Sequence, residues 1–384
     1  MQKALDLFQR IASDLISDEK SKPVSDYIPS KKLYQQLDLA LRENPINEKE
    51  FEEVLREVVF ASPRTATPSF FNQLFGGRNE TAVLGELLSV LLNNSMYTYK
   101  AGGAAVGVEK SVLRESCNKI GWGEDSDGTF ASGGSLTNFM AMLMARDTTF
   151  QDVRKKGMHT PITVYTSEES HYSIPKNAAF CGIGRDQVRY IATDKKGKMI
   201  PQELICQIEE DINAGYVPSF LNLTAGTTVL GAFDSIEELL PIAIKYNIWT
   251  HVDGAYCGSV IFSNRYKNLI KGLKGVNSFS FNAHKMIGTP LTCSLLLVKD
   301  KTQLYRSFSN EASYLYQTET DEFNPGQTSL QCGRRNDALK FWALWKSIGT
   351  SGLEKIVDKQ FALAYVARNY DKNHPDYELH SFDD

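Results

Sequence analysis

The sequence lacks several features that would assign it at once to a common class of protein. No apolar stretch approaches the length of a membrane-spanning helix, and the N-terminus has no apolar core of a signal peptide. The six cysteines are scattered without a C-x-x-C pair, which is typical of reduced thiols in a cytosol rather than of a disulfide framework. The sequence therefore predicts a cytoplasmic protein that does not enter a membrane.

The charge pattern and the motifs of several binding classes are missing as well. A net charge of −4 without a basic stripe argues against a nucleic-acid partner. No G-x-x-x-x-G-K-[ST] loop occurs, and "GIGRDQ" has Gln187 in place of the third glycine of a dinucleotide loop. "SGGSLTN" does not supply the G-x-S-x-G of a serine hydrolase, and His251 with Asp253 has no further spaced ligands. We therefore predict no metal site and rank nucleotide and hydrolase sites low.

What is present is an ordinary globular composition, with 42% hydrophobic residues in 384. Residues 1–62 contain helical segments separated by Pro-punctuated polar stretches, and we interpret them as an N-terminal helical arm. Further along, helical patterns such as Ser235 to Tyr246 alternate with short apolar runs, which predicts an α/β fold with a largely parallel sheet covered by helices. The runs are "PITVYTS", "QVRYIAT", "SFLNLTA", "IWTHVD", "SFSFNAH" and "CSLLLVKD".

Polar residues follow several of these runs, where ligands bind in open α/β sheets. They lie at Ser167 to His171, Thr224 to Thr228, Asp253 and Asn282 to Lys285. The lysine of "NAHKMIG" is either the solvated end of a strand or an amine that waits for a carbonyl group. This edge of the sheet is therefore the predicted site.

Three further features each allow two interpretations. In "FASGGSLTNFM" a Gly-Gly-Ser turn enters a helix, which is either a phosphate cradle or a turn in which Ser135 caps the helix. Asp253 either binds a protonated ring nitrogen, with Ala255 leaving room for a flat ring, or caps a turn. His171 either stacks on that ring or satisfies a strand end. Together with the lysine, the functional interpretations are the parts that pyridoxal 5′-phosphate requires.

The sequence resembles the group II pyridoxal-phosphate-dependent amino-acid decarboxylases, within them the glutamate, aspartate and cysteine-sulfinate branch. The resemblance extends from about Phe70 to Asp337. The ordered combination of "SHYS", "HVD-x-A" and "HK" is its most specific part. The matching motifs are "FFNQLFGG", "MYTYK", "GGSLTN", "TSEESHYSI", "KGKMIP", "TAGTTVLGAFD", "HVDGAYCGS", "NAHKM", "ASYLYQ" and "LQCGRRND".

The resemblance implies a role for each matching residue. Lys285 would form the Schiff base with the cofactor, and Asp253 would keep the pyridine nitrogen protonated. His171 would stack on one ring face, with the Ala255 methyl on the other. The remaining cofactor-binding positions, around the phosphate and the ring substituents, are Gly134, Ser135, Asn282, His284 and Thr228.

The resemblance also implies residues that act on the substrate. Tyr314, in "ASYLYQ", matches the mobile-loop tyrosine that returns a proton to the α-carbon as general acid. This loop crosses to the neighbouring subunit in the family, which implies a homodimer with its active site at the interface. Gln73 matches a substrate-side residue. Lys285, Tyr314 and His171 are thus the expected catalytic residues.

Some positions depart from the family pattern. Ala283 replaces the usual proline, which is expected to change only local backbone stiffness. Gly254 replaces alanine and Tyr256 replaces the tryptophan common in the acidic branch, and these two changes are expected to affect substrate identity more than chemistry. Residues 63–345 are expected to form the cofactor-binding large domain, a fold-type I architecture with a mostly parallel seven-stranded sheet. Residues 346–384 are expected to begin a truncated C-terminal small domain, and no arginine matches the one that this domain supplies.

The expected reaction is α-decarboxylation of an acidic L-amino acid, with glutamate ahead of aspartate and cysteine sulfinate. Two alternatives stay open. One is an inactive cofactor-binding remnant or interaction protein, because the C-terminal part of the family pattern is missing. The other is a different fold-type I reaction, such as transamination.

Overall fold

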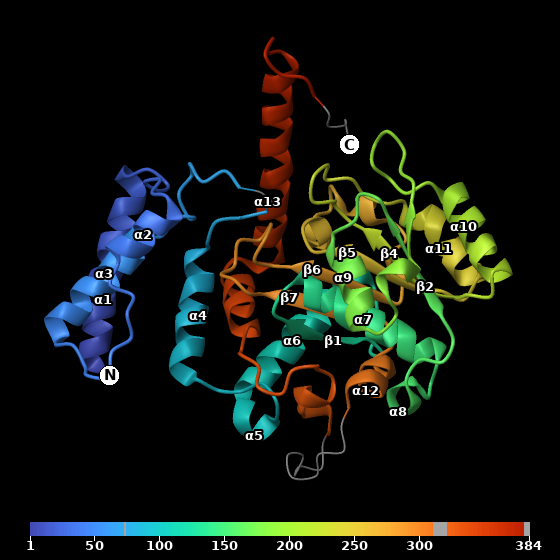
Figure 1. Cartoon of the computed structure of the whole chain (residues 1–384), viewed down its shortest axis with the longest axis horizontal. Coiled ribbons are helices and arrows are strands. Elements are labelled where there is room, and N and C mark those ends of the chain that lie inside the picture. Colours follow the sequence, from blue (N-terminus) through green and yellow to red (C-terminus); the bar gives the residue numbers. More distant parts are fainter. Residues whose placement is uncertain (73, 310–320, 380–384) are drawn as a thin grey trace. The chain divides into compact units, whose positions relative to one another are not determined.

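The computed structural model describes residues 1–72, 74–309 and 321–379 of the chain. The chain divides into two compact units, Met1–Gly77 and Arg78–Asp384 (Figure 1). The first unit thus extends 15 residues past the limit of the predicted helical arm, since 77 − 62 is 15. The predicted domain limits at residues 62 and 345 stay predictions.

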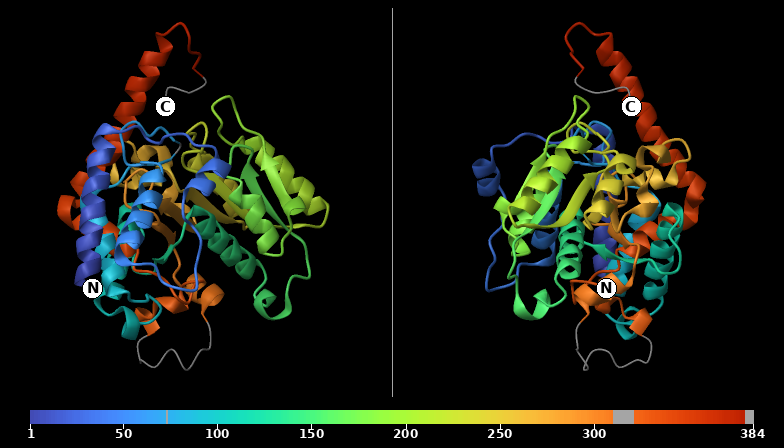
Figure 2. Two further views of the ribbon diagram at one scale, coloured as in Figure 1. Left: turned by 60° about the vertical axis from the view of Figure 1, so that its left-hand side comes forward. Right: turned by 90° about the vertical axis from the view of Figure 1, so that its right-hand side faces the viewer.

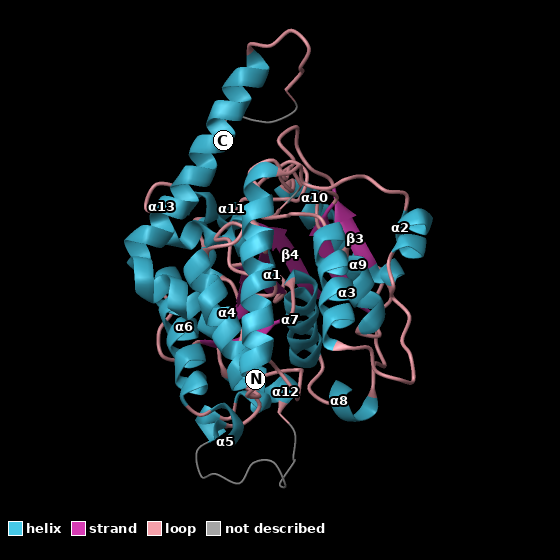
Figure 3. Ribbon diagram, turned by 90° about the vertical axis from the view of Figure 1, so that its left-hand side faces the viewer, coloured by secondary structure: helices cyan, strands magenta, loops and turns pink. Residues whose placement is uncertain are grey.

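The first unit consists of α1 (Gln2–Ser21), α2 (Ser30–Gln36) and α3 (Glu48–Ala61). Figure 3 shows the three helices of this unit. Ion pairs link α1 to α3, with Arg10 2.7 Å from Glu52 and Arg56 2.5 Å from Asp14. Ile11 is the buried residue of α1, and α2 and α3 have none among the described residues. This unit therefore has little apolar core of its own.

The second unit is built on a seven-stranded sheet with the order β1-β7-β6-β5-β4-β2-β3 among the described residues. Strand β7 pairs antiparallel with β1 and β6, and the other pairings are parallel. This confirms the predicted α/β class with its mostly parallel sheet. The strands are β1 (Asp127–Ala131), β2 (Ile162–Ser167), β3 (Val188–Ile191), β4 (Val217–Thr224), β5 (Trp249–Gly254), β6 (Ser278–Asn282) and β7 (Ser294–Val298).

Helices cover both faces of this sheet (Figure 2). The helices are α4 (Glu80–Leu92), α5 (Tyr99–Gly102), α6 (Ala104–Ile120), α7 (Gly134–Thr149), α8 (Val153–Lys156), α9 (Ser173–Phe180), α10 (Pro201–Asn213), α11 (Ile236–Lys245), α12 (Thr302–Phe308) and α13 (Ala338–Lys372). Short 3-10 helices lie at Arg185–Gln187, Cys257–Phe262, Lys267–Ile270, Leu273–Gly275, Asp321–Phe323 and Pro325–Gln327. Within the described residues, no helix is long and apolar enough to cross a membrane.

The core has two layers because side chains alternate across each strand. In β7, Leu295 and Leu297 join the layer formed with α6, α10, α11 and α13, whereas Leu296 and Val298 join the layer formed with α7, α9 and α12. A strand that is buried on both faces is apolar along its whole length, as expected for a sheet between two helical layers. The continuous run "SLLLV" follows from this position.

The six apolar runs named above correspond to β2 to β7, and the helical pattern at Ser235 to Tyr246 to α11. Strand β1, with the sequence "DGTFA", was not among them. Its first half is polar, so the sequence does not show the apolar run that is typical of a buried strand. Helix α13 extends past residue 345 and departs from helical geometry at Gly349, where φ is 67°. After Gly349 the helix still packs on the second unit through the buried Leu353 and Val357, and its C-terminal end projects from the unit (Figure 2).

Candidate active site

A pocket of about 220 Å³ lies where β4, β5 and β6 end, beside the first turn of α7. Parallel strands bring their carboxyl ends to one edge, so residues far apart in the sequence meet there. All nine predicted cofactor-binding residues line this pocket. Its lining is Gly134, Ser135, His171, Tyr172, Thr224, Gly226, Thr228, Asp253, Ala255, Tyr256, Asn282, His284 and Lys285.

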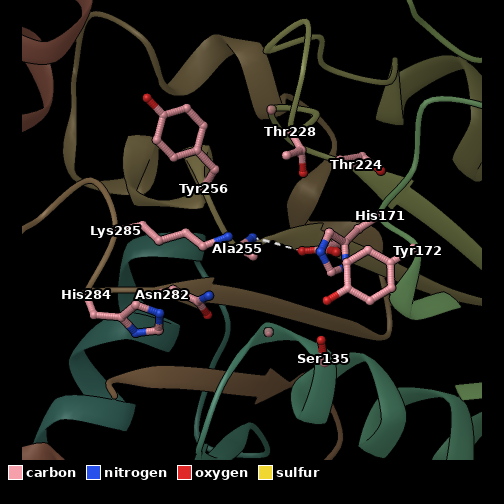
Figure 4. A pocket seen from close by; sticks show the side chains of 13 residues that line it. Ser135, His171, Tyr172, Thr224, Thr228, Ala255, Tyr256, Asn282, His284 and Lys285 are labelled. Carbon is pink, nitrogen blue, oxygen red and sulfur yellow. Dashed lines mark hydrogen bonds between the residues drawn. The ribbon is translucent and has the colours of Figure 1, made fainter. Parts of the chain in front are cut away.

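The N-terminus of α7 forms one wall of the pocket, with Ser135 in its first turn (Figure 4). A Cβ atom on Gly134 would lie 3.0 Å from the Ala255 Cβ and 3.2 Å from Asn282 Nδ2, so a larger residue here would have to displace these side chains by a few tenths of an ångström. Within the described residues, no side chain caps α7. Backbone N–H groups of the first turn, with the helix dipole behind them, favour an anion at this point.

His284 adds a hydrogen-bond donor beside Asn282. The Cys293 N–H donates to His284 Nδ1 at 2.9 Å, while the Cys293 carbonyl already accepts from the Ala283 N–H at 2.9 Å. Burial lowers the pKa of His284 to about 4, so the ring is neutral at pH 7. Because Nδ1 accepts, Nε2 carries the proton and is a donor. Together with the α7 N-terminus, this donor suits a phosphate group.

Lys285 follows β6 and its side chain extends into the pocket toward Ala255 (Figure 4). Burial lowers the pKa of Lys285, whereas the Asp253 carboxylate opposes that shift. A lower pKa increases the unprotonated fraction of the amine, which is the form that attacks a carbonyl carbon. The position and the lowered pKa of Lys285 therefore suit its amine to act as a nucleophile toward a carbonyl group in the pocket.

Asp253 lies buried at the end of β5, with its carboxylate in the pocket wall. The Ala255 N–H donates to Oδ1 at 2.9 Å, and Asn138 Nδ2 donates to Oδ2 at 2.7 Å. A carboxylate has about four lone-pair sites, so these two bonds leave acceptor capacity for a further donor. A protonated ring nitrogen is such a donor.

His171 lies across the pocket from Lys285, with its ring 4.2 Å from the Tyr172 ring (Figure 4). The Ser173 N–H donates to His171 Nδ1 at 3.2 Å, which fixes the ring orientation. Burial lowers the pKa of His171, which Asp253 raises and Lys285 lowers further. A neutral imidazole held this way can stack on an aromatic ring.

The pocket contains four residues that were not predicted as site residues, namely Tyr172, Thr224, Gly226 and Tyr256. Tyr172, Gly226 and Tyr256 lie within two residues of a predicted one, and Thr224 begins the strand-end stretch Thr224 to Thr228, so the strand-end positions already indicated their segments. Gln73 and Tyr314, the predicted substrate-side residue and general acid, lie outside the described residues. Their assignments stay predictions.

Two buried oxygen atoms in the pocket wall test whether it suits a polar ligand. Asn282 Oδ1 and Thr224 Oγ1 have no hydrogen-bond partner within the described part of the chain. A buried polar group without a partner costs free energy, so such atoms mark places where a bound group completes the hydrogen bonding. A phosphorylated pyridine aldehyde fits this set, because the pocket offers it an amine, a carboxylate, a flat slot and an anion site.

Fold and site thus define an α/β protein that binds pyridoxal phosphate. Residues 30–383 match the family model of the pyridoxal-dependent decarboxylase conserved domain. The chain therefore belongs to this family of lyases, and pyridoxal 5′-phosphate is its cofactor.

Among curated relatives, the chain is 39% identical over 367 residues to the cysteine sulfinic acid decarboxylase of Homo sapiens, which covers 94% of this chain and 74% of that protein. It is 37% identical over 356 residues to an acidic amino acid decarboxylase of Mus musculus, covering 91% and 64%. The crystal structure of mouse CSAD superimposes with a TM-score of 0.92 at 34% identity, covering 98% of this chain and 81% of that one.

Proposed function

We propose that the chain removes the α-carboxyl group of an acidic L-amino acid, with Lys285 holding the aldehyde carbon of the cofactor. The observation that carries this proposal is the convergence of all nine predicted cofactor-binding residues on one pocket. The relatives named above act on cysteine sulfinate and on acidic amino acids, which supports an acidic substrate. The sequence motifs favoured glutamate as the substrate. Because the relatives include a cysteine sulfinic acid decarboxylase, we now rank cysteine sulfinate above glutamate.

When bound, the cofactor supplies an electron sink for the electron pair that CO2 leaves behind. The protein residues have separate tasks around it. Asp253 holds a proton at the ring nitrogen, while the His171 ring and the Ala255 methyl enclose the two faces of the ring. The first turn of α7 and His284 Nε2 would hold the phosphate, which would orient the aldehyde toward the amine of Lys285.

Tyr314 is the proposed donor of the proton that returns to the α-carbon, and Gln73 the proposed donor to the acidic side chain of the substrate. For Tyr314→Phe we expect normal cofactor binding with loss of amine product, because only the protonation step lacks its acid. Gln73→Leu is expected to raise KM for acidic substrates more than it lowers kcat.

We further propose that the enzyme is a homodimer. Helix α4 carries a row of leucines at helical spacing whose side chains are exposed, from 37% to 61%, and an exposed apolar row of this kind is typical of a protein interface. These residues are Leu84, Leu87, Leu88, Leu91 and Leu92. Light scattering after gel filtration is expected to give twice the monomer mass of 43.0 kDa, and a monomer in Leu88→Glu.

The experiment that tests the function combines a spectrum with a substrate panel. After loading with pyridoxal phosphate and dialysis, we expect a visible cofactor band in the wild type and in Lys195→Ala, an exposed lysine in a turn, but not in Lys285→Ala. CO2 should then be released from cysteine sulfinate, aspartate or glutamate and not from leucine. A keto-acid product would instead indicate transamination, and a band without any product would indicate a cofactor-binding protein that is not an enzyme.

A further inference from the structure

A row of buried polar side chains connects Asp253 to the interior of the sheet. Asn138, on α7, donates to Asp253 Oδ2 at 2.7 Å, and its Oδ1 lies 3.1 Å from His251 Nε2 on β5. His251 Nδ1 lies 2.9 Å from Ser278 Oγ on β6, and Trp249 Nε1 donates to the same hydroxyl at 2.9 Å. All five side chains are buried, between 0% and 6% exposed.

The hydrogen bonds of this row have one consistent direction. The Trp249 N–H can only donate, so Ser278 Oγ accepts from it and has its single proton left for His251 Nδ1. His251 then carries its proton on Nε2 and donates to the Asn138 carbonyl oxygen. At the other end, the Asp253 carboxylate can only accept, which places the Asn138 NH2 group toward it. Both ends of the row therefore require the same orientation of the imidazole and of the amide.

The imidazole of His251 is suited to such a fixed orientation. Burial lowers its pKa to about 4, so at neutral pH it carries a single proton. The hydrogen bonds of Ser278 and Asn138 assign that proton to Nε2. Besides the Asn138 oxygen at 3.1 Å, Nε2 has Ser280 Oγ within 3.5 Å, at the limit of a hydrogen bond. The Phe220 ring stacks on the imidazole at a centroid distance of 6.0 Å and an angle of 21°.

We propose that Asn138, with its amide oriented by His251, is a positioning residue that holds the Asp253 carboxylate toward the ring nitrogen of the cofactor. The inference rests on the proposed role of Asp253 and adds to it. The Ala255 N–H belongs to the same chain segment as Asp253 and fixes only one carboxylate oxygen. Asn138 reaches the other oxygen from α7, the helix whose N-terminus forms the phosphate side of the pocket. In this proposal, α7 contributes to binding at the phosphate of the cofactor through its N-terminus and at the ring nitrogen through Asn138 and Asp253.

The test compares Asn138→Leu with Asn222→Leu. Asn222 is an equally buried amide on β4 whose Nδ2 donates to Thr166 Oγ1 at 3.2 Å, outside the row. Each protein is loaded with pyridoxal phosphate labelled with 15N in the ring, whose chemical shift reports the protonation of that nitrogen. In Asn138→Leu we expect a shift toward the unprotonated value and a cofactor dissociation constant raised about 10-fold or more, the worth of one hydrogen bond to a charged group. Asn222→Leu should leave both unchanged.

An unchanged ring-nitrogen shift in folded Asn138→Leu overturns the proposal. Where that variant does not fold, as judged by its melting curve without cofactor, Ser278→Ala decides, because it removes the donor to His251 without touching the carboxylate. A smaller shift in the same direction is expected there, and no shift overturns the proposal. Asp253→Asn distinguishes a failure of the proposed role of Asp253 from a failure of the proposed role of Asn138. If it leaves the nitrogen protonated, the proposed role of Asp253 itself is wrong.

Discussion

Two buried carboxylates, Glu109 and Asp253, are satisfied in opposite ways. Glu109 on α6 receives both guanidinium arms of Arg334, at 2.7 and 2.6 Å, so the two charges neutralise each other. Asp253 accepts only from the neutral N–H groups of Asn138 and Ala255, and it forms no ion pair with any described residue. The Glu109 carboxylate is fully paired with Arg334, whereas the Asp253 carboxylate lines a pocket.

The difference separates a structural charge, that of Glu109, from one for which we propose a function, that of Asp253. A buried ion pair with complete hydrogen bonding has no capacity left for a ligand, and it ties α6 to the segment before α13. Asp253 accepts from neutral donors only and has no counter-ion among its hydrogen-bond partners, so a cationic ligand group can still pair with it. In the proposed role of Asp253, the ring nitrogen of the cofactor offsets the cost of burying this carboxylate.

The largest expected effect that follows from this comparison is at Asp253. Asp253→Asn should lower kcat/KM by about 10³-fold, because loss of one partner of a buried charge pair costs roughly 4 kcal/mol. The free energy of unfolding of the cofactor-free protein should fall by at most about 1–3 kcal/mol, because loss of the buried charge is offset by one N–H donor, of Asn138 or Ala255, that loses its acceptor. Steady-state kinetics and urea unfolding check the two halves. A strongly destabilised cofactor-free variant would contradict the functional interpretation of this carboxylate.

The second-largest effect is expected for the buried ion pair of Arg334 with Glu109. Arg334→Leu should lower the free energy of unfolding by about 3 kcal/mol, because it leaves Glu109 buried without its counter-ion. The double variant with Glu109→Leu should recover most of this loss, since no charge then stays buried. Cofactor affinity of the folded protein should be unaffected in both. If the double variant is no more stable than the single one, the pair is not the reason for the loss.

A third buried carboxylate, Asp234, shares one feature with each of the other two. Like Asp253 it accepts from neutral N–H groups, and like Glu109 it does not line the pocket. It accepts from the Met199 N–H at 2.8 Å and from the Thr224 N–H at 2.7 Å. Burial raises the pKa of Asp234 to about 6. In the unfolded chain the group titrates near pH 4, so between about pH 4 and 6 the folded protein holds a proton that the unfolded chain has released. Stability therefore falls as the pH rises through this window.

Asp234→Asn removes this dependence. We expect the free energy of unfolding of the wild type, relative to that of the variant, to fall by about 2 kcal/mol between pH 4 and pH 7. Urea unfolding at several pH values in this range measures the difference. A difference that is constant with pH would mean that Asp234 is ionised in the folded protein throughout the range.

The smallest effect is expected for an exposed pair. Arg10→Ala removes the ion pair with Glu52 between α1 and α3, where water solvates both charges. Such pairs contribute little, so the melting temperature of the first unit should hardly change, at low or at high salt. A large loss that disappears at high salt would show that ion pairs, rather than the small apolar core, stabilise this unit.

Much of the site could be predicted because strand ends are visible in a sequence. Asp253 and Lys285 each follow an apolar run, and the parallel order of β4, β5 and β6 brings such positions together. The Gly-Gly-Ser turn likewise indicated the first turn of α7. Local pattern sufficed wherever a functional residue lies directly after a buried element.

The residues that support Asp253 could not be found in this way. Asn138 lies in the middle of α7 and His251 in the middle of β5, where an isolated polar residue has no distinguishing sequence pattern. Their roles depend on contacts between elements more than 100 positions apart in the chain, as between Asn138 and His251 at a separation of 113. The same holds for the edge strand β1, which is defined by its pairing with β7 rather than by its own composition.

The most direct test of the central claim is to locate the covalent attachment of the cofactor. The protein loaded with pyridoxal phosphate is reduced with borohydride, digested and mapped by mass spectrometry. We expect the reduced cofactor on Lys285, in the peptide that contains "NAHKMIG", and on no other lysine in stoichiometric amount. Attachment to a different lysine, or none after reduction of a loaded protein, would contradict the assignment of this pocket as the active site.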